Sequence, residues 1–379
     1  MQQTSNKAMH YSGITAFQRC PRKFYYRYIE GLRSEADPLA PTRGTWMHTL
    51  LAAHMINLGV FKSSLHSNIR LQMPDDVGTM LVGEDVNAMS ALNRLNEWWG
   101  RLPEALREDY TVSGLTLPQV CHALWMAVEE NLQEFFDRIK PIYVEQPWER
   151  DGLYGTVDLV YQDEVTDNLG IVDWKTTGSM PDGAYRLMDA QLYLYAWGIS
   201  PDLERIGFKS IDEVAQVYVW TSPPKAPSLK KDGGLSKAKG KTIGEWARGY
   251  AHYHLLNTDD AAGDPLKPDL EEWIAENDAT DKYVEHRPMP ILDSVARQVL
   301  SDFALTVEEV SDLLDLAEGS HGEEGQMESK RKLEQRVVDR SCEWLCEFKD
   351  LCFAELMGND TTEIRERFEI EGVGEDDDG

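Results

Sequence analysis

The middle of the chain alternates apolar and polar residues in the way that β-strands do. Such stretches lie at 141–151, 153–163 and 169–177, and the turn-forming residues VTDN separate the last two. Alternation on both sides of a polar turn predicts an antiparallel hairpin. A helix is predicted next, at 182–198, and a fourth strand follows at 214–220.

The parts of the chain on either side of these strands repeat apolar residues at helical spacing. Between 44 and 58, one apolar stripe consists of Trp46, Leu50, Leu51 and Met55. Strands enclosed by helices predict a mixed α/β core. The other predicted helices are 12–31, broken at Pro21, then 117–139, 290–318 and 327–345.

These patterns divide the chain into predicted parts around one core. The stretches directly before and after the core show little periodic signal and are interpreted as insertions. The parts are N-terminal helices at 1–59, a helical insertion or cap at 60–140, the core at 141–221, a basic loop and insertion at 222–289, C-terminal helices with a cysteine group at 290–358, and an acidic tail at 359–379.

The composition limits where this protein works and what it binds. Its 66 acidic and 38 basic residues give a formal net charge of −28, which argues against a protein that coats nucleic acid over its whole surface but allows a local basic patch. No run of eighteen apolar residues occurs, and the first thirty residues do not resemble a secretion leader. We therefore expect a cytoplasmic protein without a membrane partner. The tail EGVGEDDDG is expected to be a solvated end, with a phosphate-mimicking regulatory segment as the alternative.

Three charged residues interrupt the apolar strands of the core. In IVDWKTT, strand alternation places Asp173 and Lys175 on one face and Val172 and Trp174 on the other. Asp158 interrupts the preceding strand in the same way, so the hairpin can bring Asp158 and Asp173 to one cation with Lys175 beside it. Two carboxylates and a lysine are the minimum set for metal-assisted phosphodiester hydrolysis. The alternative is a structural Asp–Lys pair at a sheet edge.

Two further candidates come from the flanking helices. Gln191 and Tyr195 stand four residues apart, on one face of the helix after the lysine strand, where they can line the same site. His48 lies on a largely apolar helix, where a histidine is more often a packed core residue than a ligand. The order His48, Asp158, Asp173-x-Lys175, Gln191-x3-Tyr195 is more specific than any of its members.

The cysteines indicate a metal or cluster site. Three of the five lie in CEWLCEFKDLC, as Cys342, Cys346 and Cys352, while Cys20 lies at the helix junction before Pro21. An odd number of cysteines, most of them close together, does not fit an extracellular disulfide framework. Helical spacing accounts for Cys342 and Cys346 on one buried face, but not for Cys352.

The loop PPKAPSLKKDGGLSKAKGKT adds a basic segment to an acidic protein. Its six lysines allow contact with the phosphates of a single strand, and the alternative is a mobile, solvated loop. The same loop resembles a phosphate-binding P-loop but has the wrong spacing, because Gly234 lies one residue too far from the Gly240-Lys241-Thr242 triplet. An ATPase or helicase is therefore not expected.

Read together, the motifs resemble a known family. The stretches SGITAFQRCPRKFYYRYIEGL, GTWMH, YGTVDLV, IVDWKTT, QLYLY and CEWLCEFKDLC follow the order seen in the RecB-like branch of the PD-(D/E)XK nuclease superfamily. The chain is most similar to its cluster-containing exonucleases, akin to the CRISPR-associated RecB-like enzymes and the nuclease module of the AddB helicase subunit. The resemblance implies a restriction-endonuclease-like mixed sheet flanked by helices, with a cysteine cluster joining the N- and C-terminal helical regions.

The resemblance also implies roles for individual residues. It makes Lys175 the catalytic lysine, with Gln191 and Tyr195 positioning the strand or supporting the metal site. Glu145 matches a position that is often acidic in the family. The implied ligands of Mg²⁺ or Mn²⁺ are His48, Asp158, Asp173 and the backbone carbonyl of Trp174.

For the thiols, the resemblance implies a [4Fe–4S] cluster held by Cys20, Cys342, Cys346 and Cys352. Cys121 is left over and is expected to pack in the core. The family usually has two residues between the first two C-terminal cysteines, whereas this chain has three. Four cysteines could also hold Zn²⁺, and sequence does not separate the two possibilities.

The expected activity is that of a metal-dependent DNA exonuclease. The resemblance implies hydrolysis that leaves a 5′-phosphate on single-stranded DNA or DNA ends, in recombination, repair, or phage- or CRISPR-associated DNA processing. A helicase or recombination protein is an expected partner. The alternative is a non-catalytic DNA-end-binding subunit of a recombination complex with the same fold.

Overall fold

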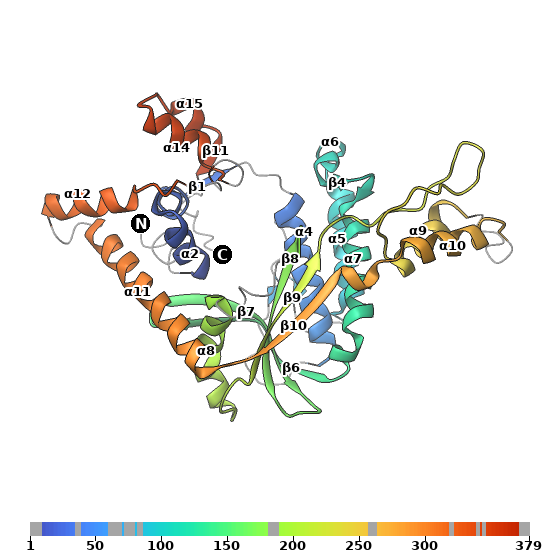
Figure 1. Cartoon of the computed structure of the whole chain (residues 1–379), viewed down its shortest axis with the longest axis horizontal. Helices are drawn as coiled ribbons and strands as arrows, with labels where there is room; N and C mark the ends of the chain where they lie inside the picture. The colour runs from blue at the N-terminus through green and yellow to red at the C-terminus, as the bar shows by residue number, and fades with distance from the viewer. Residues whose placement is uncertain are drawn as a thin grey trace.

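A five-stranded mixed sheet forms the centre of the computed structural model (Figure 1). The structure describes residues 10–34, 39–59, 70–71, 80–81, 86–180, 189–256, 264–317, 322–338, 342 and 346–370. The strands are β6 Ile139–Arg150, β7 Leu153–Asp163, β8 Leu169–Thr177, β9 Glu213–Trp220 and β10 Val284–Pro290. Their order is β10-β9-β8-β7-β6, with β8 and β9 parallel and the other neighbours antiparallel. The predicted mixed α/β core is confirmed.

The β7–β8 hairpin forms across the predicted turn. Asp163 closes that turn by accepting hydrogen bonds from the backbone N–H groups of Val165 and Thr166, at 2.9 and 3.0 Å. Asp167 takes a left-handed backbone conformation with φ of 64°, which aspartate tolerates better than most residues. Local turn chemistry therefore sets the register that later brings the acidic residues together.

The sequence did not predict β10, which lies in the stretch interpreted as a loop and insertion. It pairs with β9 along its whole length, from Val284 opposite Val219 to Pro290 opposite Glu213. Two prolines weaken its strand signal, and they are tolerated because β10 is at the edge of the sheet. The boundaries of the six predicted parts stay a prediction.

Helices cover both faces of the sheet and give two apolar cores (Figure 1). On one face lie α4 Leu39–Asn57, α5 Ala88–Arg101 and α7 Leu117–Phe136. The predicted stripe of α4 is confirmed, since Trp46, Leu50, Leu51 and Met55 are fully buried. On the other face lie α2 Tyr11–Arg19, α8 Ala190–Arg205 and α11 Asp293–Ala317. The first part of the helix predicted at 182–198 lies outside the described residues.

The remaining elements surround this centre. At the N-terminal side, α3 Pro21–Phe24 follows α2 with Cys20 between them, as predicted, and the π-helical turn η1 Tyr25–Ile29 ends before Gly31 at φ of 70°. Beyond β9, the chain forms α9 Gly244–His254 and α10 Lys267–Asn277. The short elements are β2 Arg70–Leu71, β3 Met80–Leu81, α6 Glu104–Arg107, η3 Glu108–Tyr110, β4 Thr111–Val112, β5 Leu115–Thr116 and η6 Thr280–Lys282.

The C-terminal region returns to the N-terminal helices. It consists of α12 Gly322–Leu333, α14 Lys349–Leu356, α15 Thr362–Arg365 and β11 Phe368–Ile370. The helix predicted at 327–345 is interrupted after Leu333, because residues 335–338 have no regular structure, while Cys342 is helical again and the rest of 339–345 lies outside the described residues. Strand β11 pairs with β1 Leu32–Ser34, and a small core of Tyr26, Leu32, Phe348 and Leu351 lies beneath them. None of the described helices is long and apolar enough to cross a membrane.

Candidate active site and metal centre

The candidate site forms where β7 and β8 separate. Their ladder runs from Gln162 opposite Leu169 to Leu159 opposite Val172, and the next two residues, Asp158 and Asp173, are not paired through the backbone. Instead, Asp158 Oδ2 accepts a hydrogen bond from the Trp174 backbone N–H at 2.7 Å. The carboxylate thereby satisfies a buried donor that the neighbouring strand no longer reaches.

Lys175 is held between two elements at this point. Its Nζ donates to Asp173 Oδ1 at 3.0 Å and to Gln191 Oε1 at 2.9 Å. Asp173 Oδ2 lies 2.9 Å from the same ammonium, an ion-pair contact that lacks hydrogen-bond angles. Gln191 Nε2 in turn donates to Tyr195 OH at 2.6 Å. The strand alternation and the helical spacing thus place these four predicted residues in one connected network.

A second group contains the donor set for a metal ion. His48 of α4, Glu145 of β6 and Asp158 of β7 each offer one ligand atom, and these atoms lie within 4.8 Å of one another. His48 Nδ1 is 3.8 Å from Asp158 Oδ1, and the Trp174 backbone lies close enough to the ring to affect the pKa of His48. An imidazole, two carboxylates and a nearby backbone group fit a divalent cation such as Mg²⁺ or Mn²⁺.

Glu145, which only the family resemblance had suggested, belongs to this group, while Asp173 does not. It lies between the pairs Val144–Leu159 and Gln146–Val157, directly opposite Asp158 in register. Its φ of 49° is left-handed and unusual for a strand residue, and such strain is found most often at functional sites. The register between β6 and β7, which shifts between Pro141 and Tyr143, brings Glu145 opposite Asp158, and no local sequence pattern could show this. A direct ligand role for Asp173 stays a prediction, because its carboxylate contacts Lys175.

Burial gives the acidic residues unusual proton affinities. It raises the pKa of Glu145, with the charge of Asp158 adding to the effect. It also raises the pKa of Asp158 and of Asp173, against the opposing influence of Lys175 on both. Burial lowers the pKa of His48, so its imidazole is neutral at pH 7 and free to act as a ligand. This excess of buried acid over base is the electrostatic setting in which a divalent cation binds well.

Another carboxylate, Asp189, positions the helix that carries Gln191. Its Oδ1 caps α8 by accepting from the Gln191 backbone N–H at 2.9 Å, and it also accepts from Tyr11 OH at 3.0 Å. Its Oδ2 accepts from Gln216 Nε2 at 2.8 Å. Tyr11, Asp189 and Gln216 could not be singled out from the sequence, because they come from separate parts of the chain.

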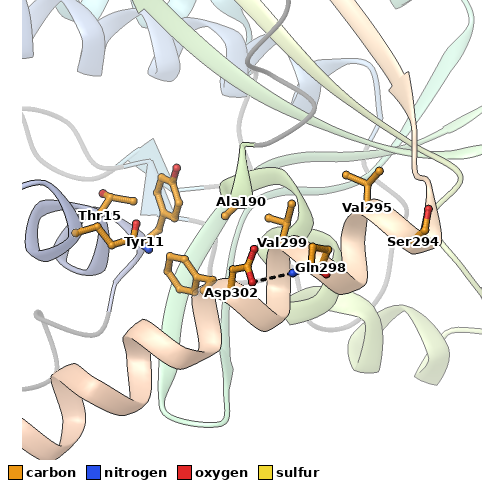
Figure 2. Close-up of a pocket in the computed structure, with 10 residues that line it drawn as sticks. Tyr11, Thr15, Ala190, Ser294, Val295, Gln298, Val299 and Asp302 are labelled. Carbon is orange, nitrogen blue, oxygen red and sulfur yellow. Dashed lines mark hydrogen bonds between the residues drawn. The ribbon is translucent and has the colours of Figure 1, made fainter.

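A cavity of about 500 Å³ lies next to this cap. In Figure 2, Tyr11 and Thr15 of α2 face Val299 and Asp302 of α11, with Ala190 of α8 beside them. The cavity adjoins the start of α8, the helix that carries Gln191 and Tyr195, but none of the candidate catalytic residues lines it. It is therefore a neighbouring space rather than the reaction site.

The four predicted cysteines come together at one place. Cys20, Cys342, Cys346 and Cys352 line a cavity of about 180 Å³ with Arg336. The Arg336 Nε donates to the Cys352 sulfur at 3.3 Å, and Cys121 is buried in the core as expected. Among the described residues, no three cysteine sulfurs lie within 4.8 Å of one another.

Comparison with known proteins agrees with this geometry. The family model of the PD-(D/E)XK nuclease superfamily matches residues 9–353. This range contains both the His48–Glu145–Asp158 group and the four predicted cluster cysteines. A search of curated proteins finds no match. The fold, the parted strands and the lysine between Asp173 and Gln191 lie within the matched range. This chain belongs to the PD-(D/E)XK nuclease superfamily.

Proposed function

We propose that the protein is a Mg²⁺- or Mn²⁺-dependent DNA exonuclease acting on single strands or DNA ends. The family supports a metal-dependent nuclease, and the resemblance to RecB-like enzymes supports the finer assignment. One observation carries the proposal: the Lys175 ammonium lies between Asp173 and Gln191, beside the His48–Glu145–Asp158 group.

Each residue has a task in phosphodiester hydrolysis. His48, Glu145, Asp158 and the Trp174 carbonyl would hold the cation, with Asp173 as a further predicted ligand. A divalent cation bound here supplies polarisation of the scissile phosphate and acidification of a water. The Lys175 ammonium orients the attacking water and stabilises negative charge that develops on the phosphate.

The protonation state of Lys175 suits this task. Burial opposes its charge, but the neighbouring Asp173 raises the pKa of the ammonium overall, so it stays protonated at pH 7. Gln191 and Tyr195 fix its direction through consecutive hydrogen bonds of 2.9 and 2.6 Å. The lysine is thus pre-positioned, and little reorganisation is needed during the reaction.

The test is cleavage of end-labelled single-stranded DNA with Mg²⁺ or Mn²⁺ by the wild type and by Asp173→Ala. We expect metal-dependent cleavage that the substitution abolishes, whereas Asp137→Ala, at an exposed position after α7, leaves it unchanged. Strands blocked at the 5′ or the 3′ end report polarity, and circular single strands separate exonuclease from endonuclease activity. A wild type that binds DNA but never cleaves it would support the non-catalytic end-binding subunit instead.

We also propose that Cys20, Cys342, Cys346 and Cys352 hold a [4Fe–4S] cluster. A tetrahedral zinc site with Zn–S bonds of about 2.3 Å needs sulfurs roughly 3.8 Å apart. The described cysteines line one cavity but are spread more widely than that, which favours a larger group. Its place between the N-terminal helices and α14 supports an architectural role.

Absorbance near about 400 nm with iron and sulfide content tests the cluster, and stoichiometric zinc in a colourless anaerobic preparation would establish the zinc alternative. We expect Cys346→Ala to lose colour, thermal stability and cleavage together. Cys121→Ala, at a buried core position, should keep the colour. An unchanged melting temperature and unchanged cleavage in Cys346→Ala would contradict the proposal.

The biological setting follows from the resemblance alone. We propose work in recombination, repair, or phage- or CRISPR-associated DNA processing, with a helicase or recombination protein as partner. The end preference found in the cleavage test narrows these settings, because resection enzymes act from free ends.

A further inference from the structure

The segment 222–242, here called the lysine hairpin, is the basic element that the catalytic network does not use. It contains six lysines and one aspartate in a chain whose formal net charge is −28. All six lysines are exposed, and none forms an ion pair with any residue that the structure describes. Six lysines without an ion pair on one short segment of an acidic protein form a candidate site for a ligand of opposite charge.

The lysine hairpin has a defined backbone. Its two arms are joined by hydrogen bonds from Lys225 N to Lys241 O at 2.7 Å and from Ser236 N to Ser228 O at 2.7 Å. At the closed end, Lys230 N donates to Gly234 O at 2.8 Å. These contacts argue against the mobile, solvated loop that the sequence left open.

Buried polar residues anchor the base of the lysine hairpin. Thr242 is fully buried, and its hydroxyl donates to Lys225 O at 2.7 Å. The side chain of Asn277, at the end of α10, accepts from Gly240 N at 2.8 Å. Because both anchors are internal hydrogen bonds, they hold the backbone from which Lys225, Lys239 and Lys241 extend.

The base of the lysine hairpin adjoins the strand of the catalytic lysine. Lys241 Nζ lies 4.4 Å from the centre of the Trp220 ring, and Trp220 Nε1 donates to Gly178 O at 3.0 Å. Trp220 also pairs in parallel register with Thr177, two residues after Lys175. In Figure 1 the segment leaves the end of β9 and runs toward α9 and α10. The lysine hairpin therefore begins at the end of the sheet that lies next to Lys175, not at the opposite end.

The lysines are not equivalent. Lys237 faces Asp269, Glu272 and Glu276 of α10 across a cavity of about 80 Å³, so part of its charge is compensated. Lys225 and Lys241, at the base, have no acidic side chain in salt-bridge distance within the described chain. The base is also the part of the segment that contacts Trp220, through Lys241, so it links the lysines to the sheet that carries Lys175.

We propose that the lysine hairpin binds the phosphates of the DNA strand whose scissile bond lies at Lys175. This deepens the proposed nuclease function and rests on it. Phosphate binding depends on local Lys and Arg, and the rest of this acidic surface repels DNA, so one ordered basic element beside the site supplies most of the attraction. The lysine hairpin orders the strand on one side of the cleavage point, while Trp220 holds Lys241 in place.

The test is binding without chemistry. A fluorescein-labelled single strand of about 30 nucleotides is titrated in EDTA, by anisotropy, between about 50 and about 200 mM salt. The hairpin variant is Lys225→Gln with Lys239→Gln and Lys241→Gln. The matched control replaces the dispersed, exposed Lys209, Lys267 and Lys332 by glutamine and so removes the same net charge. A third variant, Thr242→Val, removes the anchor hydroxyl and no charge.

We expect the hairpin variant to bind about tenfold or more weakly at low salt, with its salt slope reduced by roughly 2, since each phosphate contact with a single strand contributes about 0.7. The control should change affinity less than about twofold, and Thr242→Val should lie between them. A hairpin variant that binds like the control overturns the inference, as does a wild type that binds no strand. A wild type that binds through the lysine hairpin but does not cleave DNA with Mg²⁺ or Mn²⁺ would refute the nuclease function alone.

Discussion

Two regions of the molecule differ in their charge balance. Where the C-terminal region packs on the N-terminal helices, the carboxylate of Glu355 is surrounded by arginines. Where β7 and β8 separate, three carboxylates lie near a single lysine. Glu355 accepts from Tyr26 OH at 2.6 Å and from Arg365 at 2.7 Å, contacts Arg22 directly, and lies 3.5 Å from Arg336. Burial tends to raise its pKa, but these hydrogen bonds and charges hold it below the ordinary value.

The group around Asp158 shows the opposite balance. Burial raises the pKa of Glu145, Asp158 and Asp173, and Lys175 offsets part of that effect at Asp158 and Asp173 only. At neutral pH the group around Asp158 lowers the free energy of unfolding of the metal-free protein, whereas the group around Glu355 raises it. Clusters that complete their own charge balance hold the fold together. Clusters left with excess negative charge are suited to an external cation.

The largest expected effect separates the two groups by activity. Lys175→Ala should lower the cleavage rate about 10³-fold, because it removes a pre-positioned charge from the transition state. Its free energy of unfolding should change by less than about 1 kcal/mol, since Asp173 can take up a proton when the ammonium is gone. Single-turnover cleavage and urea unfolding measure the two quantities. A large stability loss with little change in rate would make Lys175 structural.

Glu355→Gln should give the reverse pattern. The substitution removes the carboxylate that Arg22, Arg336 and Arg365 share, while Glu334 still faces Arg22 and Glu30 still faces Arg365. We expect a loss of about 2 kcal/mol, less than for a buried pair that is broken completely. The cleavage rate per folded molecule should change by less than about threefold, as expected for a substitution outside the site. Glu363→Gln, at an exposed position in α15, is the control and should leave unfolding unchanged. Equal losses of rate and stability would mean that the junction also shapes the site.

How much of this site the sequence could predict depends on the range of the interactions. Asp173 and Lys175 follow from strand alternation, and Gln191 and Tyr195 from helical spacing, so local geometry alone places each pair. Glu145 depends on the register between β6 and β7 and on a bulge, which no local pattern encodes.

The same reasoning explains the errors in the fold. The strand β10 contains two prolines and pairs with a strand more than sixty residues earlier, so its signal was lost among loop residues. The helix α5 carries local signals that were missed, namely a capping box between Asn87 and Ser90 and a buried face that includes Leu92, Leu95 and Trp98. The distant partner of β10 accounts for the missed strand, whereas the start of α5 could have been predicted from its own residues.

A smaller effect concerns the metal-free protein. Burial raises the pKa of Glu145 from 4.5 to about 8, so the unfolded chain releases this proton more readily than the folded chain. Glu145→Gln should therefore raise the free energy of unfolding by about 1 kcal/mol near neutral pH. The advantage shrinks as the pH falls below that raised pKa, and it disappears near 4.5, where the unfolded chain is protonated as well. Urea unfolding in EDTA measures this, with the exposed Glu149→Gln as control. Saturating Mn²⁺ should reverse the order of stability. A destabilised Glu145→Gln in EDTA would contradict the contrast between the groups.

The smallest effect tests a buried titratable group outside both clusters. Burial, with Arg138 nearby, lowers the pKa of His286 from 6.5 to about 4, and its ring packs 4.6 Å from Phe135. The unfolded chain binds the proton more tightly, so stability falls as the pH drops from 6.5 toward 4. His286→Phe should recover about 1 kcal/mol at about pH 5, after allowance for partial exposure, and nothing at about pH 8. His252→Phe, at an exposed position in α9, should leave the acid limb unchanged. Parallel acid limbs for the wild type and His286→Phe would remove His286 as a cause.

The pairing of β1 with β11 has a consequence for synthesis in the cell. Leu32 emerges from the ribosome more than three hundred residues before Ile370, its partner in the ladder. At about 5–20 residues per second, the N-terminal helices wait roughly 15 to 70 s for that partner. During this time Tyr26 and Leu32, fully or almost fully buried in the finished molecule, have no C-terminal core to pack against. Assembly of this end is therefore a late step, which cannot begin until β11 has been made.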